Sequence, residues 1–401
     1  MHEAPRFDLC FYTHHILMKK SLIAAALLAS FTCAAHAQSS VTLYGLIDVG
    51  LVYVNNSGGH SQYSMGAGNL AGDRWGMKGT EDLGGGLKAL FVLENGFSLA
   101  NGRLGQGGDE FGRHAYVGLS SSKFGTVTIG RQYDAITDLT YMFVGAQTWA
   151  GYSSAHPGDV DNTDGSNHVN NAIKFTSVSY GGFTFEGTYS LGGVAGRFNQ
   201  NQVWTVAANY VRGPLTLGAA FADAQDPNFS YFGNNAASST TGSNMSGSPV
   251  YSGYASAKKQ QIFTVGASYV IGPATVAVDY SNTQFKNIGA LAGLPATGAG
   301  GDARFHDIEV NVLYKVTPTL FLGADYNYLK GYGVNGATYH QGAVGADYIL
   351  SKRTDFYAKA VYQHASGTDS TGGKAVAALN GWAASSTQNQ TQVVLGIRHR
   401  F

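Results

Sequence analysis

The sequence predicts an all-β fold, a transmembrane 16-stranded antiparallel β-barrel. Three observations lead to this prediction: the alternating pattern of the last strand, an aromatic and weakly charged composition, and connections that are alternately short and long. Together they favour a closed sheet in a membrane, because lipid offers no water to satisfy the backbone groups of an open edge.

The last segment of the chain, residues 389–401, has one apolar face and ends on an aromatic side chain. One face carries Gln390, Gln392, Val394, Gly396, Arg398 and Arg400, and the other carries Thr391, Val393, Leu395, Ile397, His399 and Phe401. Successive side chains of a strand point to opposite faces, so one side suits hydrocarbon and the other suits water. Such a strand is well suited to close a barrel in a membrane.

The composition is aromatic, rich in glycine and weakly charged. The 401 residues include 24 Tyr, 21 Phe and 55 Gly, and 12% are charged, whereas a soluble domain carries about 25%. The apolar run Leu22–Phe31 is too short for a transmembrane helix, which needs about 20 residues. The composition therefore favours strands as the elements that cross the membrane.

The N-terminal region predicts a secretory signal peptide at residues 18–37. Lys19 and Lys20 precede the apolar run, and Ala35, His36 and Ala37 form the small-x-small pattern of a cleavage site. Residues 1–17 lie upstream of this complete signal, so we interpret them as an over-extended start. The barrel domain is then residues 38–401.

Neither cysteine belongs to the predicted mature chain, because Cys10 and Cys33 precede residue 38. We therefore expect no disulfide and no thiol chemistry. His14 and His15 could form a metal site with Cys10, but all three lie upstream of the signal, so we expect no metal. Removing residues 1–37 leaves 22 basic (25 − 3) and 23 acidic (25 − 2) groups, and this balance gives no reason to expect nucleic acid as a partner.

Short and long connections alternate along the predicted barrel domain. Seven tight turns are expected at Glu81–Gly86, Ser120–Lys123, Tyr180–Gly182, Arg212–Pro214, Ile271–Pro273, Val316–Pro318 and Leu350–Arg353. Eight long connections rich in Gly, Ser, Asn, Ala and Thr are expected at 55–72, 98–111, 134–169, 192–201, 224–259, 285–303, 331–338 and 366–387. These connections join sixteen strands, and a barrel of about 16 to 18 strands is wide enough for an aqueous channel.

The segments between these connections alternate in polarity as strands of a membrane barrel should. The clearest examples lie at residues 41–54, 183–191, 204–210, 263–269 and 306–315. In the last of them, Ile308 and Val310 alternate with Asp307 and Glu309. Each strand therefore has an apolar face for lipid and a polar face for a wet interior.

Several segments carry the motifs of one family of membrane proteins. They are SSVTLYGLIDVGL (39–51), RWGMKGTEDLGGGLKALFVLENGF (74–97), FGRHAYVGLSSSKFGTVTIGRQYD (111–134), VNNAIKF (169–175) and GIRHRF (396–401). Through them the predicted mature chain resembles the general porins of β-proteobacterial outer membranes. The resemblance implies a homotrimer in outer-membrane lipid, each barrel with its own pore for small hydrophilic solutes and ions. It also implies an inward-folded third loop that narrows the pore.

The third loop is expected at residues 134–169, which together with 224–259 is the longest expected connection, and loops of this length are usually functional or disordered. Its acidic residues are Asp134, Asp138, Asp159, Asp161 and Asp164. The resemblance implies that they face a basic cluster on the barrel wall, formed by Arg74, Lys78, Arg113 and Arg131. Alternation supports the lumenal direction of Arg74 and Lys78, because Trp75 and Met77 take the opposite face.

Alternation conflicts with the resemblance at two of these positions. Arg131 shares its face with Val127 and Ile129, and Arg113 is similarly aligned with apolar residues of its own strand. An arginine that faces lipid near the midplane costs about 2 to 4 kcal/mol. A bulge at Gly130 would reset the register and turn Arg131 towards the pore.

Two more residues are singled out by comparison with the family pattern. His168 stands just before the VNN motif, where the family commonly has an arginine. It either replaces a fixed charge in the pore by a titratable one, or is a solvated loop residue without effect on transport. The terminal Phe401 resembles the signal that the barrel-insertion machinery recognises.

A passive channel is the function that the sequence favours, while an outer-membrane adhesin or receptor stays open because long polar loops permit it. A barrel hydrolase is disfavoured, since the histidines have no GxSxG partner and no metal-ligand spacing. Gly84–Gly86 lack the Lys-Ser/Thr of a phosphate loop, so we expect no catalysis and no cofactor.

We expect a modest anion preference, although several acids also face the lumen, namely Asp48, Glu186, Asp279, Asp307 and Glu309.

Overall fold

The computed structural model describes residues 40–234, 242–334 and 336–401. The predicted over-extended start and signal peptide, with both cysteines, lie outside the described residues. Within the described ranges, no helix is long and apolar enough to cross a membrane.

All strands belong to one antiparallel sheet. They are β1 (Ser40–Ser57), β2 (His60–Ala67), β3 (Arg74–Gly84), β4 (Leu87–Gly96), β5 (His114–Ser121), β6 (Gly125–Gln132), β7 (Val169–Ser177), β8 (Phe183–Ser190), β9 (Val203–Arg212), β10 (Leu215–Gln225), β11 (Lys259–Ile271), β12 (Ala274–Lys286), β13 (Ala303–Lys315), β14 (Leu320–Gly333), β15 (Thr338–Ile349), β16 (Thr354–Ser366) and β17 (Asn389–Arg400). The helices are α2 (Ala135–Thr140) and α3 (Pro227–Ser230), with short helical turns at Gln106–Gly108, Tyr141–Phe143, Ala146–Ala150, Tyr152–Ser154, Pro157–Asp159 and Ser252–Tyr254.

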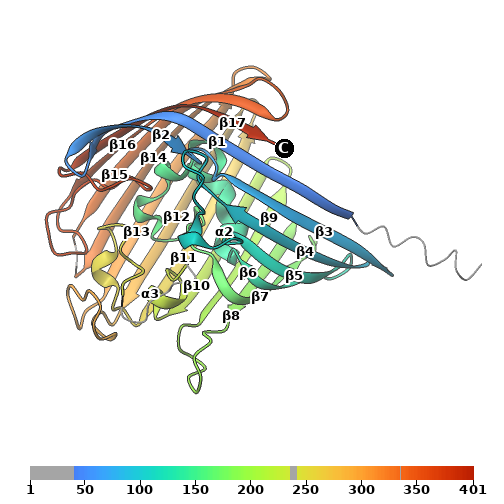
Figure 1. Cartoon of the computed structure of the whole chain (residues 1–401), viewed down its shortest axis with the longest axis horizontal. Coiled ribbons are helices and arrows are strands. Elements are labelled where there is room, and N and C mark those ends of the chain that lie inside the picture. Colours follow the sequence, from blue (N-terminus) through green and yellow to red (C-terminus); the bar gives the residue numbers. More distant parts are fainter. Residues whose placement is uncertain (1–39, 235–241, 335) are drawn as a thin grey trace, which may run out of the picture.

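The sheet closes on itself into the tilted barrel of Figure 1. Along one edge, β1 pairs with β17 over Leu46–Val54. Along its other edge, β1 pairs with β2 and with β3, which lie end to end. The 17 strands of the sheet therefore occupy 17 − 1 = 16 positions around the barrel, as the sequence predicts.

The turns agree with the sequence prediction, but one expected loop does not. All seven tight turns lie at the predicted places, whereas 55–72 is mostly strand because β1 continues to Ser57 and β2 begins at His60. The polar composition of this stretch resembles a loop, yet it alternates: Tyr63 and Met65 are exposed on the apolar face. The wall is interrupted at residues 68–73, between β2 and β3. The Asp48 carboxylate fixes this stretch by accepting hydrogen bonds from the backbone N–H groups of Leu70 and Ala71.

The barrel wall has an exposed apolar face and an enclosed polar face. In β13, Ile308 and Val310 are exposed, whereas Asp307 and Glu309 are buried. The same alternation holds in β17 and follows the sequence prediction. Exposed aromatic side chains gather near the short-turn end of the wall, namely Tyr180, Phe183, Tyr269, Tyr314, Tyr348, Phe356 and Phe401. Aromatic rings at this level are typical of the boundary between lipid and water.

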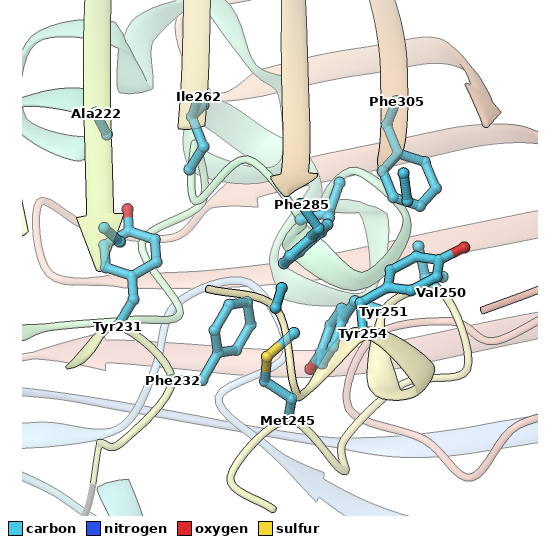
Figure 2. Packing of buried hydrophobic residues seen from close by; sticks show 14 of the residues in the cluster. Ala222, Tyr231, Phe232, Met245, Val250, Tyr251, Tyr254, Ile262, Phe285 and Phe305 are labelled. Carbon is cyan, nitrogen blue, oxygen red and sulfur yellow. The ribbon is translucent and has the colours of Figure 1, made fainter. Parts of the chain in front are cut away.

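At the long-connection end, a hydrophobic cluster joins strand ends to the β10–β11 connection (Figure 2). Ile262, Phe285 and Phe305 come from the strands, while Tyr231 and Met245 come from the connection. All five side chains are nearly inaccessible to solvent. The same cluster includes residues of α2, so the connections and α2 form one packed body.

Candidate channel constriction

Residues 133–168 connect β6 to β7, and we call them the β6–β7 segment. The segment begins with α2, which Asp134 caps because its carboxylate accepts a hydrogen bond of 3.0 Å from the backbone N–H of Thr137. Capping satisfies one of the free N–H groups at a helix start. Short helical turns follow, and the segment forms hydrogen bonds with Thr205 of β9 and Gln392 of β17.

Two aromatic rings fix the β6–β7 segment on pairs of glycines. Gly218 of β10 pairs with Gly266 of β11, and a Cβ atom at either would meet the ring of Phe143. Gly323 and Gly345 likewise pair across β14 and β15 beneath Trp149. The missing side chains leave shallow sockets, so the two rings lie directly on the backbone of the wall.

Polar contacts hold the segment between these two sockets. Glu309 accepts a hydrogen bond of 2.6 Å from the Gly145 N–H, and Asn311 donates one of 2.7 Å to the Phe143 carbonyl. The buried ammonium of Lys359 donates to three oxygens: Ala150 O (2.6 Å), Asn69 O (2.7 Å) and Ser153 Oγ (2.9 Å). Lys359 therefore joins the wall, the β2–β3 interruption and the β6–β7 segment at one point.

Beside the segment lies a cavity of about 680 Å³ whose wall carries four arginines. These are Arg74, Arg113, Arg398 and Arg400, and they share the lining with Asp73, Asp164, Tyr133 and His168. We call this space the arginine cavity. Of the residues predicted to form the constriction, it brings together Arg74, Arg113, Asp164 and His168.

Arg113 faces the cavity because it precedes β5, so strand alternation does not govern it. Its Nε donates to Glu94 Oε1 at 2.7 Å, and its Nη2 donates to the Tyr133 hydroxyl at 2.7 Å. The sequence conflict at this position arose from treating Arg113 as part of the strand.

Arg131 and Lys78 do not line the arginine cavity. The expected irregularity at Gly130 is present, because the β6–β7 pairing shifts register between Gly130 and Gln132. Arg131 then binds Gly112 O (2.7 Å), Asn170 Oδ1 (2.6 Å) and Asn234 O (3.1 Å), so its guanidinium links the β4–β5 and β10–β11 connections to β7. Lys78 is exposed, with Nζ 5.1 Å from the ring centre of Tyr44.

Four of the five acids of the segment are engaged elsewhere, which corrects the expectation that all five face the arginines. Asp134 caps α2, and Asp138 pairs with Lys174. Asp159 accepts the backbone N–H groups of Asp164 and Ser166, both at 3.0 Å. Asp161 binds His156. A short acidic side chain in a compact segment satisfies nearby backbone donors before it reaches a distant wall.

His168 belongs to the lining of the arginine cavity and is buried, so it is not a solvated loop residue. Its ring stacks on Tyr133 with centroids 4.2 Å apart and lies 5.8 Å from the ring of His114. Neither ring nitrogen has a hydrogen-bond partner among the described residues. Burial, and then the positive charges of Arg113 and Arg131, lower the pKa of His168 well below its usual range.

Comparison with known proteins agrees with this geometry. A profile described as Gram-negative porin matches residues 24–368. The chain belongs to the Gram-negative porin family. It is 31% identical over 363 residues to an outer membrane porin protein of Bordetella pertussis, covering 83% of this chain and 80% of that one. It is 30% identical over 399 residues to outer membrane porin protein 32 of Delftia acidovorans, covering 96% and 100%.

Solved structures show the same fold. The anion-selective porin from Comamonas acidovorans aligns with a TM-score of 0.70 at 24% identity, covering 91% of this chain and all of that one. The in-vitro folded OmpT of Vibrio cholerae aligns with a TM-score of 0.63 at 16% identity, covering 92% and 100%. This porin is thus an outer-membrane barrel that forms a water-filled channel for passive diffusion of small hydrophilic solutes and ions.

Sequence reasoning missed several residues of the porin's cavity region. Arg398 and Arg400 were placed on the polar face of the last strand but were not assigned to the constriction. Arg398 donates from Nε to Asp355 Oδ1 (3.0 Å) and from Nη2 to Asp347 Oδ2 (2.9 Å). Glu94, which pairs with Arg113, carried no signal beyond its place in the LFVLENGF motif.

His156 of the porin was also missed, and it lies at the centre of a buried acidic group. Its Nδ1 is 2.7 Å from Asp161 Oδ2, and its Nε2 is 3.2 Å from Glu309 Oε2 and 3.4 Å from Asp279 Oδ1. Burial opposes a charge on His156, but the carboxylates of Asp307 and Asp161 outweigh it and raise its pKa well above the usual range. A protonated His156 therefore holds the β6–β7 segment to acids of β12 and β13.

Proposed function

We propose that the β6–β7 segment is the inward-folded third loop that narrows the channel, and that the arginine cavity is the narrowed passage. The supporting observation is that this segment contacts the enclosed faces of strands from β9 to β17 while Gln147, Thr148 and Asp164 line the cavity opposite Arg74. Every ion that crosses the barrel beside the segment then passes these side chains.

We further propose that the passage prefers anions, and that Arg74 contributes the decisive charge. Arg113 is paired with Glu94, while Arg398 and Arg400 share the carboxylate of Asp355. Arg74 forms no ion pair with any described residue. A narrow passage with low-dielectric walls concentrates the field of such a charge.

The acids in the lining of the cavity are fewer than its arginines. Burial, and then the neighbouring Asp159 carboxylate, raise the pKa of Asp164 well above its usual range, which favours its uncharged form. Burial also raises the pKa of Asp73 to about 6. Asp73 is thus still largely ionised at pH 7, but the lining carries four arginines against two acids, so its formal charge is positive.

The remaining partners follow from the barrel architecture and stay proposals. We propose a homotrimer, surrounded by outer-membrane lipid, that reaches the membrane through the barrel-insertion machinery and acts without catalysis. One OmpT structure of Vibrio cholerae is described as a trimer form, which supports this assembly by analogy. Nothing in the lining favours nucleic acid as a partner.

Reversal potentials across planar bilayers under a salt gradient test the proposal. Wild type should prefer anions, and Arg74→Ala should reduce the anion-to-cation permeability ratio several-fold because the unpaired charge is lost. Lys78→Ala is the matched control, since Lys78 lies on the same face of the same strand but outside the cavity.

Three results would contradict the proposal. Cation preference in wild type would reverse the sign, and equal effects of the two substitutions would move the selective site away from the arginine cavity. A barrel that does not conduct would favour an adhesin or receptor instead.

A further inference from the structure

A second cavity, of about 290 Å³, adjoins the arginine cavity and differs from it in chemistry. It lies nearer the long-connection end, between β2, the β16–β17 connection and the β6–β7 segment. The described residues of its lining include no acid and no base. Five side-chain amides line it instead, from Gln62, Asn69, Asn101, Asn380 and Gln392. We call it the amide cavity.

Several of these amide groups have unused hydrogen-bonding capacity. Asn380 and Gln392 are 7% and 2% exposed. Within the described chain, Nδ2 of Asn380 and Oε1 of Gln392 are bonded, whereas Oδ1 of Asn380 and Nε2 of Gln392 are not. The side chain of Gln62 also bonds no described residue. A buried amide that keeps a free donor or acceptor towards a cavity is suited to bind a polar solute.

Tyr152 joins the two cavities, because it belongs to both linings. Its ring is 39% exposed and lies over Gly381, where a Cβ atom would come within 3.4 Å of Tyr152 Cδ1. Ala67, Gly68 and Ser98 are also shared. A solute in the amide cavity can therefore extend past an aromatic face into the arginine cavity.

We propose that the amide cavity is a binding subsite for the uncharged, hydroxyl-rich part of a sugar acid whose carboxylate is held by the arginine cavity. Amides supply both donors and acceptors for hydroxyl groups, and an aromatic face covers the C–H side of a sugar ring. Arginine binds carboxylates through charge-assisted hydrogen bonds. Ligand cavities start at about 300 Å³, so this one suits a single ring.

This inference rests on the proposed anion-preferring passage, and block of single-channel chloride current tests both. D-glucuronate should reduce the current at a concentration several-fold lower than acetate, which has the charge without the ring. D-glucuronate should also block the current at a lower concentration than D-glucose, which has the ring without the charge. The reversal potential is measured on the same channels.

Two substitutions in the amide cavity probe the contact directly. Gln62→Ala removes a side chain that bonds no described residue, and Tyr152→Leu removes the aromatic face. Each substitution should raise the half-blocking concentration of glucuronate about fivefold, because this is the change in affinity that one ordinary hydrogen bond gives. Block by acetate should not change. Gln388→Ala is the control, because this amide lies outside both cavities and its side chain bonds nothing in the described chain.

The outcomes separate the two proposals. A cation-preferring wild type overturns the anion passage and this inference with it. Anion preference with glucuronate no stronger than acetate overturns the subsite alone. Stronger block by glucuronate that survives both Gln62→Ala and Tyr152→Leu also overturns the subsite, because the ring would then bind elsewhere.

Discussion

The four arginines of the arginine cavity carry the same formal charge, but their neighbours decide how strongly each acts on a passing ion. Glu94 compensates Arg113 at 2.7 Å, and Asp355 is shared by Arg398 and Arg400. Arg74 has a backbone carbonyl at 3.4 Å as its nearest hydrogen-bond acceptor. Its charge is therefore the one most available to an anion.

His168 should not affect selectivity near neutral pH. Because the pKa of His168 is lowered, its ring is already neutral at pH 6.5. The ring becomes protonated only under more acidic conditions. We expect reversal potentials to show no midpoint attributable to His168 between pH 6.5 and 8. His168→Phe, which keeps a ring against Tyr133, should match wild type in this range. A wild-type midpoint near pH 7 that disappears in His168→Phe would contradict the prediction.

His156 should give the barrel a stabilising contact that is lost at alkaline pH. Its folded-state pKa is raised, so its contribution is fully present below the unfolded value of about 6.5 and disappears as pH rises through the folded value. His156→Gln leaves buried carboxylates without a positive partner and should destabilise the protein by about 3 to 5 kcal/mol at pH 6.

The temperature of heat modification on detergent gels, measured from pH 6 to 10, checks the His156 prediction. The difference between wild type and His156→Gln should shrink as pH rises. His364→Gln is the control, because His364 lies on the same barrel but outside the acidic group. A difference that grows with pH would show that His156 is neutral in the folded protein.

Sequence patterns predicted which face of the sheet a side chain within a strand points to. They did not predict the hydrogen-bond and ion-pair partners of residues within the β6–β7 segment. Alternation with Trp75 was enough to place Arg74. Apart from Asp161, the partners of His156 lie more than 100 positions away in β12 and β13, and no local pattern encodes a contact at such separation. Asp159 and Asp161 looked like pore charges because their burial depends on the fold of the whole segment.

Among the elements, β10, β11, β14 and β15 are adapted to the segment that they carry. Glycine normally weakens a strand interior, yet paired glycines recur where Phe143 and Trp149 contact the wall. The sockets can be recognised only when cross-strand pairing is known. The sequence therefore predicts the strands correctly but gives no indication of their role in holding the segment.

Filling a socket should loosen the β6–β7 segment. In Gly266→Ala the new methyl group overlaps the ring of Phe143, which must move away from the wall. We expect a loss of about 1 to 3 kcal/mol in stability, as for other overpacked sites, and larger fluctuations of the open-channel current. Current noise in planar bilayers and the temperature of heat modification measure the two effects.

Gly342→Ala provides the matched control for the socket. A Cβ atom there has Asp325 O at 3.5 Å as its nearest neighbour, an ordinary contact within the same kind of strand. Noise and stability in Gly342→Ala should equal those of wild type. If both substitutions raise the noise equally, loss of strand glycine rather than displacement of Phe143 is the cause.

The whole molecule combines a regular wall with an irregular packed interior, and the two differ in how far the sequence reveals them. Short turns and period-two alternation are local signals, so sixteen strand positions and seven turns were predictable. The stretch 55–72 was misassigned because its polar face belongs to the enclosed side of the barrel, where polar residues indicate a strand as readily as a loop. The hydrophobic cluster that joins α2 to the β10–β11 connection left no periodic trace.

Barrel closure leads to a last prediction, which separates folded stability from assembly. Phe401 N–H donates to Gly45 O and Gly45 N–H donates to Phe401 O, both at 3.0 Å, at one end of the β1–β17 ladder. Deleting Phe401 removes these bonds but leaves the nine residue pairs of that ladder, so folded protein should lose only about 1 to 3 kcal/mol.

If Phe401 is also the signal for the insertion machinery, its deletion should lower the amount of barrel in the outer membrane far more than this loss of stability explains. Gly45→Ala distinguishes the two effects, because a methyl group there overlaps the Phe401 ring and the Arg74 carbonyl in the folded barrel but keeps the C-terminal residue. We expect Gly45→Ala to reduce thermal stability while the outer-membrane level stays near wild type. The deletion should instead lower the outer-membrane level strongly and thermal stability only modestly. Heat-modification gels of outer-membrane fractions and of protein refolded in detergent measure the two quantities separately. Equal outer-membrane levels in the deletion strain and wild type would show that Phe401 only closes the sheet.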